Sequence, residues 1–137
     1  MERGNIQIKM EEGKAPVVEA TLINNGLWLT SNEIARFLGC FVQTVNGHLR
    51  SIFREHLLWE RECSVCNRYI DKGIEKQTVF YNLEVLIFVS YRVNSLEARI
   101  FRQFIHSVLR KHLKKKKTSD AKIVWKYLPA QSRYRLN

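Results

Sequence analysis

The sequence has little of what secreted, membrane-spanning or disulfide-bonded proteins need. Its three cysteines form an odd set, which favours a reducing compartment over a disulfide framework. No apolar run approaches the roughly 18 residues of a transmembrane helix. The first residues, MERGNIQIKMEEGK, lack the apolar stretch of a secretory signal. We therefore expect a cytoplasmic protein with no membrane partner.

Acidic residues are also scarce, and they are scattered. There are 13 Asp and Glu against 23 Lys and Arg, for a formal net charge of +10, and residues 98–117 hold eight bases and no acid. Metal-dependent nucleases need clustered carboxylates, and the chain also lacks a phosphate-binding glycine loop or a nucleophile motif. We expect no catalytic residue, cofactor or small-molecule substrate, and hence no enzyme. The basic balance favours a polyanionic partner.

The cysteines allow one competing interpretation. Cys63 and Cys66 have the spacing of two zinc ligands, and Cys40, His48 or His56 could complete a tetrahedral set. A single CxxC without a second pair is weak evidence. The pair also falls at the start of an expected strand, where one cysteine faces inward as a small hydrophobic residue. We expect no metal site.

What the chain does have is enough apolar material for one core. Of its 137 residues, 45% are hydrophobic, which argues against wholesale disorder. We expect one domain over residues 1–117 and a basic tail over residues 118–137.

The stretch from Leu29 to Arg54 predicts two helices joined by a short turn. Thr30 or Ser31 can cap the first helix, because the side-chain oxygen of either can accept a backbone N–H. Gly39 ends that helix and makes the turn. The second helix is expected over Phe41–Arg54. This order is typical of a helix-turn-helix, whose second helix enters the major groove of DNA.

The second helix has an apolar face and a polar face. Amide side chains suit adenine and arginine suits guanine, and no acid occurs from Ile34 to Arg54 that would repel phosphate from this face. The alternative is an ordinary helical hairpin with a solvated polar face. We predict base contacts from Gln43, Thr44, Asn46 and Arg50, and DNA-backbone contacts from Arg54, Lys72, Lys114, Lys115, Lys116 and Lys117.

Alternating apolar residues predict a β-hairpin on each side of the helix pair. The first has strands over Asn5–Met10 and Val17–Ile23, and a tight turn at Asn24–Gly26 leads from it to the first helix. Trp28, at that junction, is expected in the core.

The second hairpin is expected over Cys63–Ile70 and Ile74–Tyr81, joined by a turn at Asp71–Gly73. Its position after the helix pair makes it a candidate wing, with Lys72 at the end that would meet the DNA backbone. The alternative is a solvated hairpin, because two acids neutralise much of its charge.

Two further helices are expected. Asn82 can cap a nearly all-apolar helix over Leu83–Val93, which must be buried or covered by a partner chain. Asn94 or Ser95 can cap a long basic helix that ends in a lysine run, either a phosphate clamp or a solvated end. The expected buried stripe of this helix is Ile100 or Phe101, Phe104, Ile105, Val108, Leu109 and Leu113.

Several segments together resemble the RhuM family of bacterial virulence-associated proteins. They are WLTSNEIARFLG, TVNGHLRSIF and VFYNLEVLIFVSYRVNS, followed by a helix ending in VLRKHL, and they cover about Gly26 to Leu113. The order of elements is also similar to the Bro-N and KilA-N domains of phages and large DNA viruses. The resemblance implies a DNA-binding domain.

The sequence thus predicts an α+β, winged helix-turn-helix-like domain. Its expected function is double-stranded DNA binding in transcriptional or mobile-element regulation, as a homodimer, because such proteins commonly use two-fold symmetry. The alternative is a protein-interaction adaptor without base readout, in which the helix-turn-helix scaffold and the apolar helix over Leu83–Val93 bind a partner protein.

Overall fold

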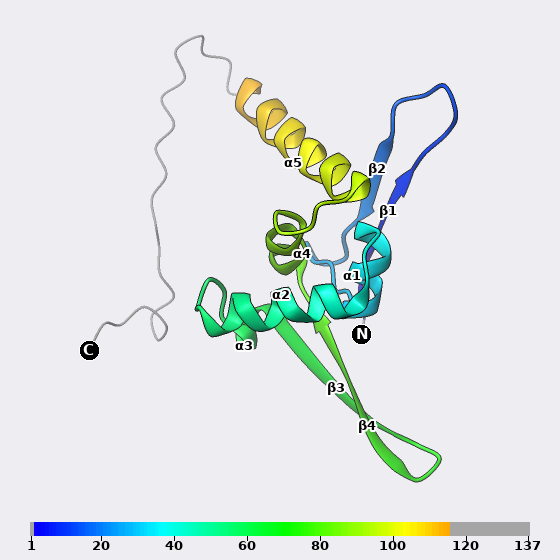
Figure 1. The fold of residues 1–137 in the computed structure, drawn as a ribbon, viewed down its shortest axis with the longest axis vertical. Helices are drawn as coiled ribbons and strands as arrows, with labels where there is room; N and C mark the ends of the chain where they lie inside the picture. Colours follow the sequence, from blue (N-terminus) through cyan, green and yellow to red (C-terminus); the bar gives the residue numbers. More distant parts are fainter. Residues whose placement is uncertain (1, 116–137) are drawn as a thin grey trace, which may run out of the picture. The chain divides into compact units, whose positions relative to one another are not determined.

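The computed structural model describes residues 2–115 and shows a mixed α+β architecture. Within these residues there are two antiparallel β-hairpins and five helices, as Figure 1 shows. The elements are β1 (Asn5–Lys9), β2 (Val17–Thr21), α1 (Ser31–Leu38), α2 (Val42–Arg54), α3 (Glu60–Cys63), β3 (Ser64–Asp71), β4 (Ile74–Tyr81), α4 (Leu83–Ser90) and α5 (Leu96–Lys114).

The chain divides into two compact units, residues 1–106 and residues 107–137, and the boundary falls within α5. The hydrophobic core lies in the first unit, where α1, α2, α4 and the beginning of α5 bury their apolar faces together. Its largest fully buried side chains include Phe101, Leu27, Ile34, Leu38 and Ile52. The expected boundary after residue 117 lies outside the described residues and stays a prediction.

Helix α1 begins with the expected side-chain cap. The Thr30 hydroxyl accepts the Glu33 backbone N–H at 3.2 Å, and the Glu33 carboxylate accepts the Thr30 N–H at 2.9 Å. This reciprocal arrangement satisfies two backbone donors that a helix N-terminus otherwise leaves unpaired. Thr30, and not Ser31, is therefore the cap.

The turn between α1 and α2 requires glycine for two reasons. Gly39 has a φ of 63°, in the left-handed region that other residues enter at a cost. A Cβ at this position would also overlap the Glu97 carboxylate of α5. Beside it, the Ser95 hydroxyl donates to the Leu38 carbonyl at 2.6 Å, so that the first turn of α5 holds the end of α1.

Helix α2 has the predicted buried face. Val45, Leu49 and Ile52 are buried in the core, at the spacing that places side chains on one side of a helix. Phe41 precedes the helix and makes no side-chain capping bond, as its apolar ring dictates.

The β1–β2 hairpin leads into α1 through the predicted tight turn. Asn24 and Asn25 both have positive φ, and Ile23 and Gly26 exchange backbone hydrogen bonds at 2.9 and 3.0 Å. The expectation that Trp28 lies in the core was wrong. Its neighbours on either side in the chain are buried, and because extended side chains alternate, Trp28 points to the other side and is half-buried.

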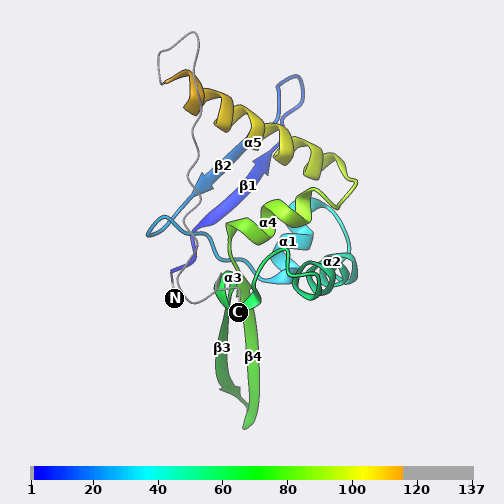
Figure 2. The same ribbon diagram turned by 90° about the vertical axis from the view of Figure 1, so that its left-hand side faces the viewer.

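The β3–β4 hairpin is close to its prediction. Its register runs from Ser64 opposite Tyr81 to Asp71 opposite Ile74, with a turn at Lys72 and Gly73. Cys63 ends α3 instead of starting β3. Figures 1 and 2 show that the hairpin projects away from the helices of the first unit.

A reciprocal backbone bridge attaches this hairpin to the start of α1. The Leu29 N–H donates to the Tyr81 carbonyl at 2.9 Å, and the Tyr81 N–H donates to the Leu29 carbonyl at 2.7 Å. The Cys63 carbonyl accepts the Asn82 N–H at 2.9 Å, which extends the pairing of β3 with β4 by one bond at the base of the hairpin. β4 is thereby fixed to the entrance of α1, and β3 is held through its pairing with β4.

Helix α4 is shorter than expected and is buried within this chain. Asn82 caps it as predicted, accepting the Val85 N–H at 3.2 Å, but the helix ends at Ser90. Ser90 is fully buried, its hydroxyl donates to the Ile87 carbonyl, and its own carbonyl accepts a hydrogen bond from Arg102.

Helix α5 begins after Ser95, whose hydroxyl accepts the Ala98 N–H at 3.0 Å. Phe101 is buried, but Val108 and Leu109, which were expected in the buried stripe, are exposed. Periodicity predicts which face of a helix is apolar, and it does not predict how much of that face meets the core. Among residues 2–115, no helix combines the length and the apolarity that crossing a membrane requires.

We predict that Gly39→Ala lowers the free energy of unfolding by about 2 kcal/mol and that Gly73→Ala lowers it by about 1 kcal/mol. Both glycines have positive φ, but a methyl group at Gly73 meets no atom within 4 Å, whereas at Gly39 it meets Glu97. Urea unfolding measures both values. The double variant Gly39→Ala, Glu97→Ala should recover the difference, and equal losses from the two single variants would contradict this account.

Candidate functional site

The exposed side of α2 gathers the predicted base-contacting residues. Gln43, Thr44 and Arg50 are exposed and Asn46 is half-buried, while Arg54 is exposed at the end of the helix. Because the opposite face of α2 is locked in the core, these side chains cannot turn inward without unfolding the helix. The structure therefore brings all five to one helix, on the side away from the core.

Phe41 is a surface residue that the sequence prediction did not include. Its side chain is 79% exposed, directly before Gln43 and Thr44 at the start of α2. Apolar side chains contact the thymine methyl group in major-groove recognition. From the sequence, Phe41 was expected only as the first residue of the second helix, and its exposure adds an apolar side chain to this surface.

A groove of about 570 Å³ lies beside this face. Asn46, Arg50 and Arg54 contribute its polar lining from α2, and Phe53 and Tyr81 contribute aromatic rings. These two rings stack with centroids 6.2 Å apart, which joins α2 to the base of the β3–β4 hairpin. The groove thus runs between the helix and the hairpin.

Glu60 corrects the expectation that nothing on this face would repel phosphate. It belongs to α3, outside the stretch that was free of acids, and it lines the same groove as Arg50 and Arg54. Burial, and next the charge of Glu60, raise the pKa of Tyr81. No local sequence pattern indicates this approach, since it follows from the turn between α2 and α3.

Arg92, in the connection between α4 and α5, contacts the C-terminal end of α2. Its guanidinium donates to the Ser51 hydroxyl at 3.0 Å and pairs with the Glu55 carboxylate at 3.5 Å. Burial, and next the charge of Arg92, lower the pKa of His48 on the same helix. Arg92 is a positioning residue that the sequence prediction missed, because its partners lie far from it in the chain.

The predicted backbone contacts are less completely placed. Lys72 is exposed at the end of the β3–β4 hairpin, where the neighbouring Asp71 is paired with Lys76 at 2.9 Å. Lys114 and Lys115 are exposed and belong to the second unit. Lys116, Lys117 and the expected tail, residues 118–137, lie outside the described residues.

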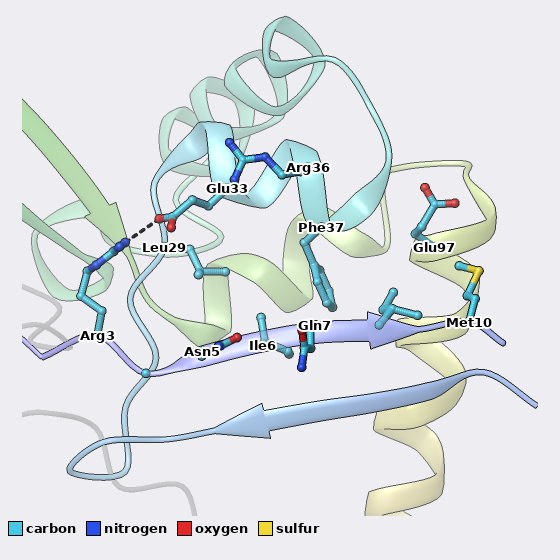
Figure 3. A pocket seen from close by; sticks show the side chains of 12 residues that line it. Arg3, Asn5, Ile6, Gln7, Met10, Leu29, Glu33, Arg36, Phe37 and Glu97 are labelled. Carbon is cyan, nitrogen blue, oxygen red and sulfur yellow. Dashed lines mark hydrogen bonds and ion pairs between the residues drawn. The ribbon is translucent and has the colours of Figure 1, made fainter.

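A second hollow, of about 490 Å³, lies between β1, α1 and the start of α5 (Figure 3). Arg3 bridges its edges, since it pairs with Glu33 at 2.6 Å and lies 5.0 Å from the centre of the Phe80 ring. Burial alone would raise the pKa of Glu33, but the Thr30 N–H and Arg3 outweigh it and lower that pKa. Arg3, just before β1, thus links the first hairpin to α1 through Glu33 and to β4 through Phe80.

The cysteines differ sharply in environment. Cys63 is buried, with its sulfur 3.6 Å from a Glu84 carboxylate oxygen, and burial together with that carboxylate raises its pKa to about 11. Cys66 is exposed on β3. Zinc binds thiolates, which a raised pKa disfavours. Within residues 2–115, no group of three or more His, Cys, Asp or Glu is arranged to hold a metal ion.

No protein-family model, curated protein or solved structure matches this chain. The resemblance to the RhuM family therefore stays a prediction, and the case for a function depends on the geometry.

We predict that iodoacetamide modifies Cys66 first and modifies Cys63 only after unfolding. With a pKa of about 11 in place of 9.0, Cys63 has about 100-fold less thiolate than an ordinary thiol at pH 8, and its side chain is also buried. Peptide mass mapping after timed labelling measures both rates, and a Cys40→Ser, Cys66→Ser variant isolates the slow one. Equal rates in the folded protein would show that Cys63 is not held as described.

Proposed function

We propose that this chain is a double-stranded DNA-binding module of the winged helix-turn-helix type. In this proposal, α1 and α2 form the helix-turn-helix, α2 enters the major groove, and the β3–β4 hairpin is the wing. The observation that carries it is the division of α2 into a face locked in the core and an exposed face with amide, hydroxyl and guanidinium groups.

The chemistry of that face suits base edges. Arginine can donate two parallel hydrogen bonds to guanine, and asparagine or glutamine can make a matching pair with adenine. Arg50 and Arg54 lie one turn apart on the same face of α2. In the proposal, Arg50, within the helix, contacts bases, and Arg54, at the helix end, contacts the DNA backbone. A helix already held by its packing loses little conformational entropy when it binds, which favours specific recognition.

The remaining cations contribute sequence-independent attraction. Lys72 on the wing and Lys114 and Lys115 at the end of α5 are exposed, and contacts between lysine and phosphate release counterions. Such contacts strengthen binding at low salt without selecting a sequence. The same role is proposed for Lys116 and Lys117 from their sequence alone.

The biological role proposed from the RhuM resemblance is transcriptional or mobile-element regulation. A homodimer is part of the proposal, because two copies related by two-fold symmetry would read two half-sites. Light scattering at rising concentration tests this part separately, and a monomer at the highest concentration would exclude it.

The alternative function is a protein-interaction adaptor that binds its partner through the helix-turn-helix scaffold and the apolar helix after Asn82. In that helix Val85, Leu86 and Val89 are fully buried in the core of this chain, which supports the DNA-binding proposal over the adaptor. Selection from a random duplex library tests the two functions directly. A DNA-binding module enriches a defined sequence, whereas an adaptor enriches none. Chromatography on heparin is a second test, in which an adaptor is expected to elute at low salt.

We predict that Arg50→Ala weakens binding to the selected site by about 1–3 kcal/mol and relaxes preference at one base position. Loss of a bidentate contact with guanine gives both effects together. Titration against the site and its single-base variants measures them. The matched control is Arg99→Ala, an exposed arginine of α5 outside α2 and the wing, which should leave base preference unchanged. Equal weakening on every sequence would contradict a base contact by Arg50.

We also predict that Glu60→Gln strengthens DNA binding, by up to about 1 kcal/mol at low salt. Glu60 lines the groove beside Arg50 and Arg54, so its carboxylate repels phosphate and competes for the guanidinium groups. The gain should shrink as salt is raised, because salt screens exposed charges. Glu84→Gln, an exposed acid on α4, is the control. Unchanged affinity for Glu60→Gln would place the DNA away from this groove.

A further inference from the structure

The wing ends in a cluster of exposed apolar side chains. Ile70 is 77% exposed and Ile74 is 61% exposed, on either side of the turn, and Tyr69 is 44% exposed beside them. The end of a hairpin that meets only solvent is expected to be polar. Grouped exposed apolar residues mark an interaction surface more often than isolated ones do.

The two isoleucines make the tip a wedge. Ile70 pairs with Glu75 and Ile74 pairs with Asp71, and residues paired across a ladder share a face, so that the isoleucines lie on opposite faces. The tip itself is unobstructed, because a Cβ added at Gly73 would meet no atom within 4 Å. The ribbon therefore ends in a narrow edge with an apolar branched side chain on each side.

The wing is long enough to reach a second groove. Its strands have eight residues each, which span about 25 Å at roughly 3.3 Å per residue. A DNA turn is about 34 Å, so the minor groove next to an occupied major groove is about 17 Å away. The backbone hydrogen bonds that link the hairpin to α1 lie at its base, and the hairpin projects from the helices of the first unit, so its tip is the end that lies away from those helices (Figures 1 and 2).

The charges near the tip favour nucleic acid as the occupant. Arg68, Lys72 and Lys76 outnumber Asp71 and Glu75 by three to two, and Lys76 occupies Asp71 in an ion pair. Among the described residues, neither Arg68 nor Lys72 has an ion-pair partner. Lys72 lies at the apex of the turn, so the end of the hairpin carries a positive charge between Ile70 and Ile74.

We propose that the tip carrying Ile70 and Ile74 enters the minor groove, where one of these two side chains partly unstacks a base step and kinks the duplex. This inference rests on the proposed DNA-binding function. Minor-groove proteins use apolar side chains in this way and bend DNA by roughly 20–90°. Isoleucine suits the role because its branched side chain is stiff. Pyrimidine–purine steps kink most easily, so a TA or CA step is expected at a fixed distance from the major-groove contacts.

The test measures DNA bending separately from binding. Energy transfer between dyes at the two ends of a duplex carrying the selected site reports the bend, and 2-aminopurine at the expected step reports unstacking. The wedge variant is Ile70→Ser, Ile74→Ser. Its matched control is Met10→Ser, Leu22→Ser, two exposed apolar residues outside the helices and the wing. Thermal unfolding confirms that both variants keep the fold.

The wild-type protein and the control are expected to bend the duplex and raise 2-aminopurine fluorescence. The wedge variant is expected to lose both signals while its binding keeps the wild-type dependence on salt, because no cation has been removed. Lys72→Ala should do the reverse, reducing the salt dependence and keeping the bend.

Three results would overturn the inference, and they are distinguishable from a failure of the proposed function. A wild-type protein that binds its site without bending it, or a wedge variant that bends it normally, excludes the wedge while DNA binding stands. A wedge variant that alters the oligomeric state and not the bend assigns the tip to a second copy of this chain. If the wild-type protein binds no duplex at all, the proposed function fails, and the wedge fails with it.

Discussion

The reciprocal backbone hydrogen bonds between Leu29 and Tyr81 are the constraint on which the arrangement of the site depends. Leu29 directly precedes the Thr30 cap of α1, and Tyr81 ends β4, so the two bonds fix the base of the β3–β4 hairpin to the entrance of the helix pair. The stacked rings of Phe53 and Tyr81 extend the same junction to α2. In the proposed function, α2 and the β3–β4 hairpin occupy neighbouring grooves and must keep one geometry relative to each other, and these backbone bonds supply that restraint.

The other side of α2 is held by the connection between α4 and α5. Arg92 binds Ser51 and Glu55 near the end of α2, while Ser95 and Glu97 close around the turn that precedes it. The helix is therefore restrained at both ends by residues that are distant in sequence. Its exposed face is presented in a single orientation, which lowers the entropy lost on binding.

How far the sequence could predict this molecule follows from the range of each interaction. The Thr30 cap, the Gly39 turn and both hairpins were predicted because each depends on residues within a few positions. The approach of Glu60 to the groove and the link from Arg92 to α2 were not predicted, because they depend on how elements pack. The same holds for the exposed end of the α5 stripe, since periodicity gives the direction of a face and not its contacts.

The electrostatics of α2 also bear on how such a site would discriminate among sequences. Two arginines lie along the groove, and the carboxylate of Glu60 offsets part of their attraction for phosphate. A surface that relied on charge alone would place more cations and no acid there, as sequence-independent binding requires. In the proposed DNA complex the electrostatic contribution is reduced at this point, so hydrogen bonds and apolar contacts with base edges would supply a larger share of the affinity. Contacts of that kind distinguish one sequence from another, and under this proposal an acid in the groove favours selectivity at the expense of strength.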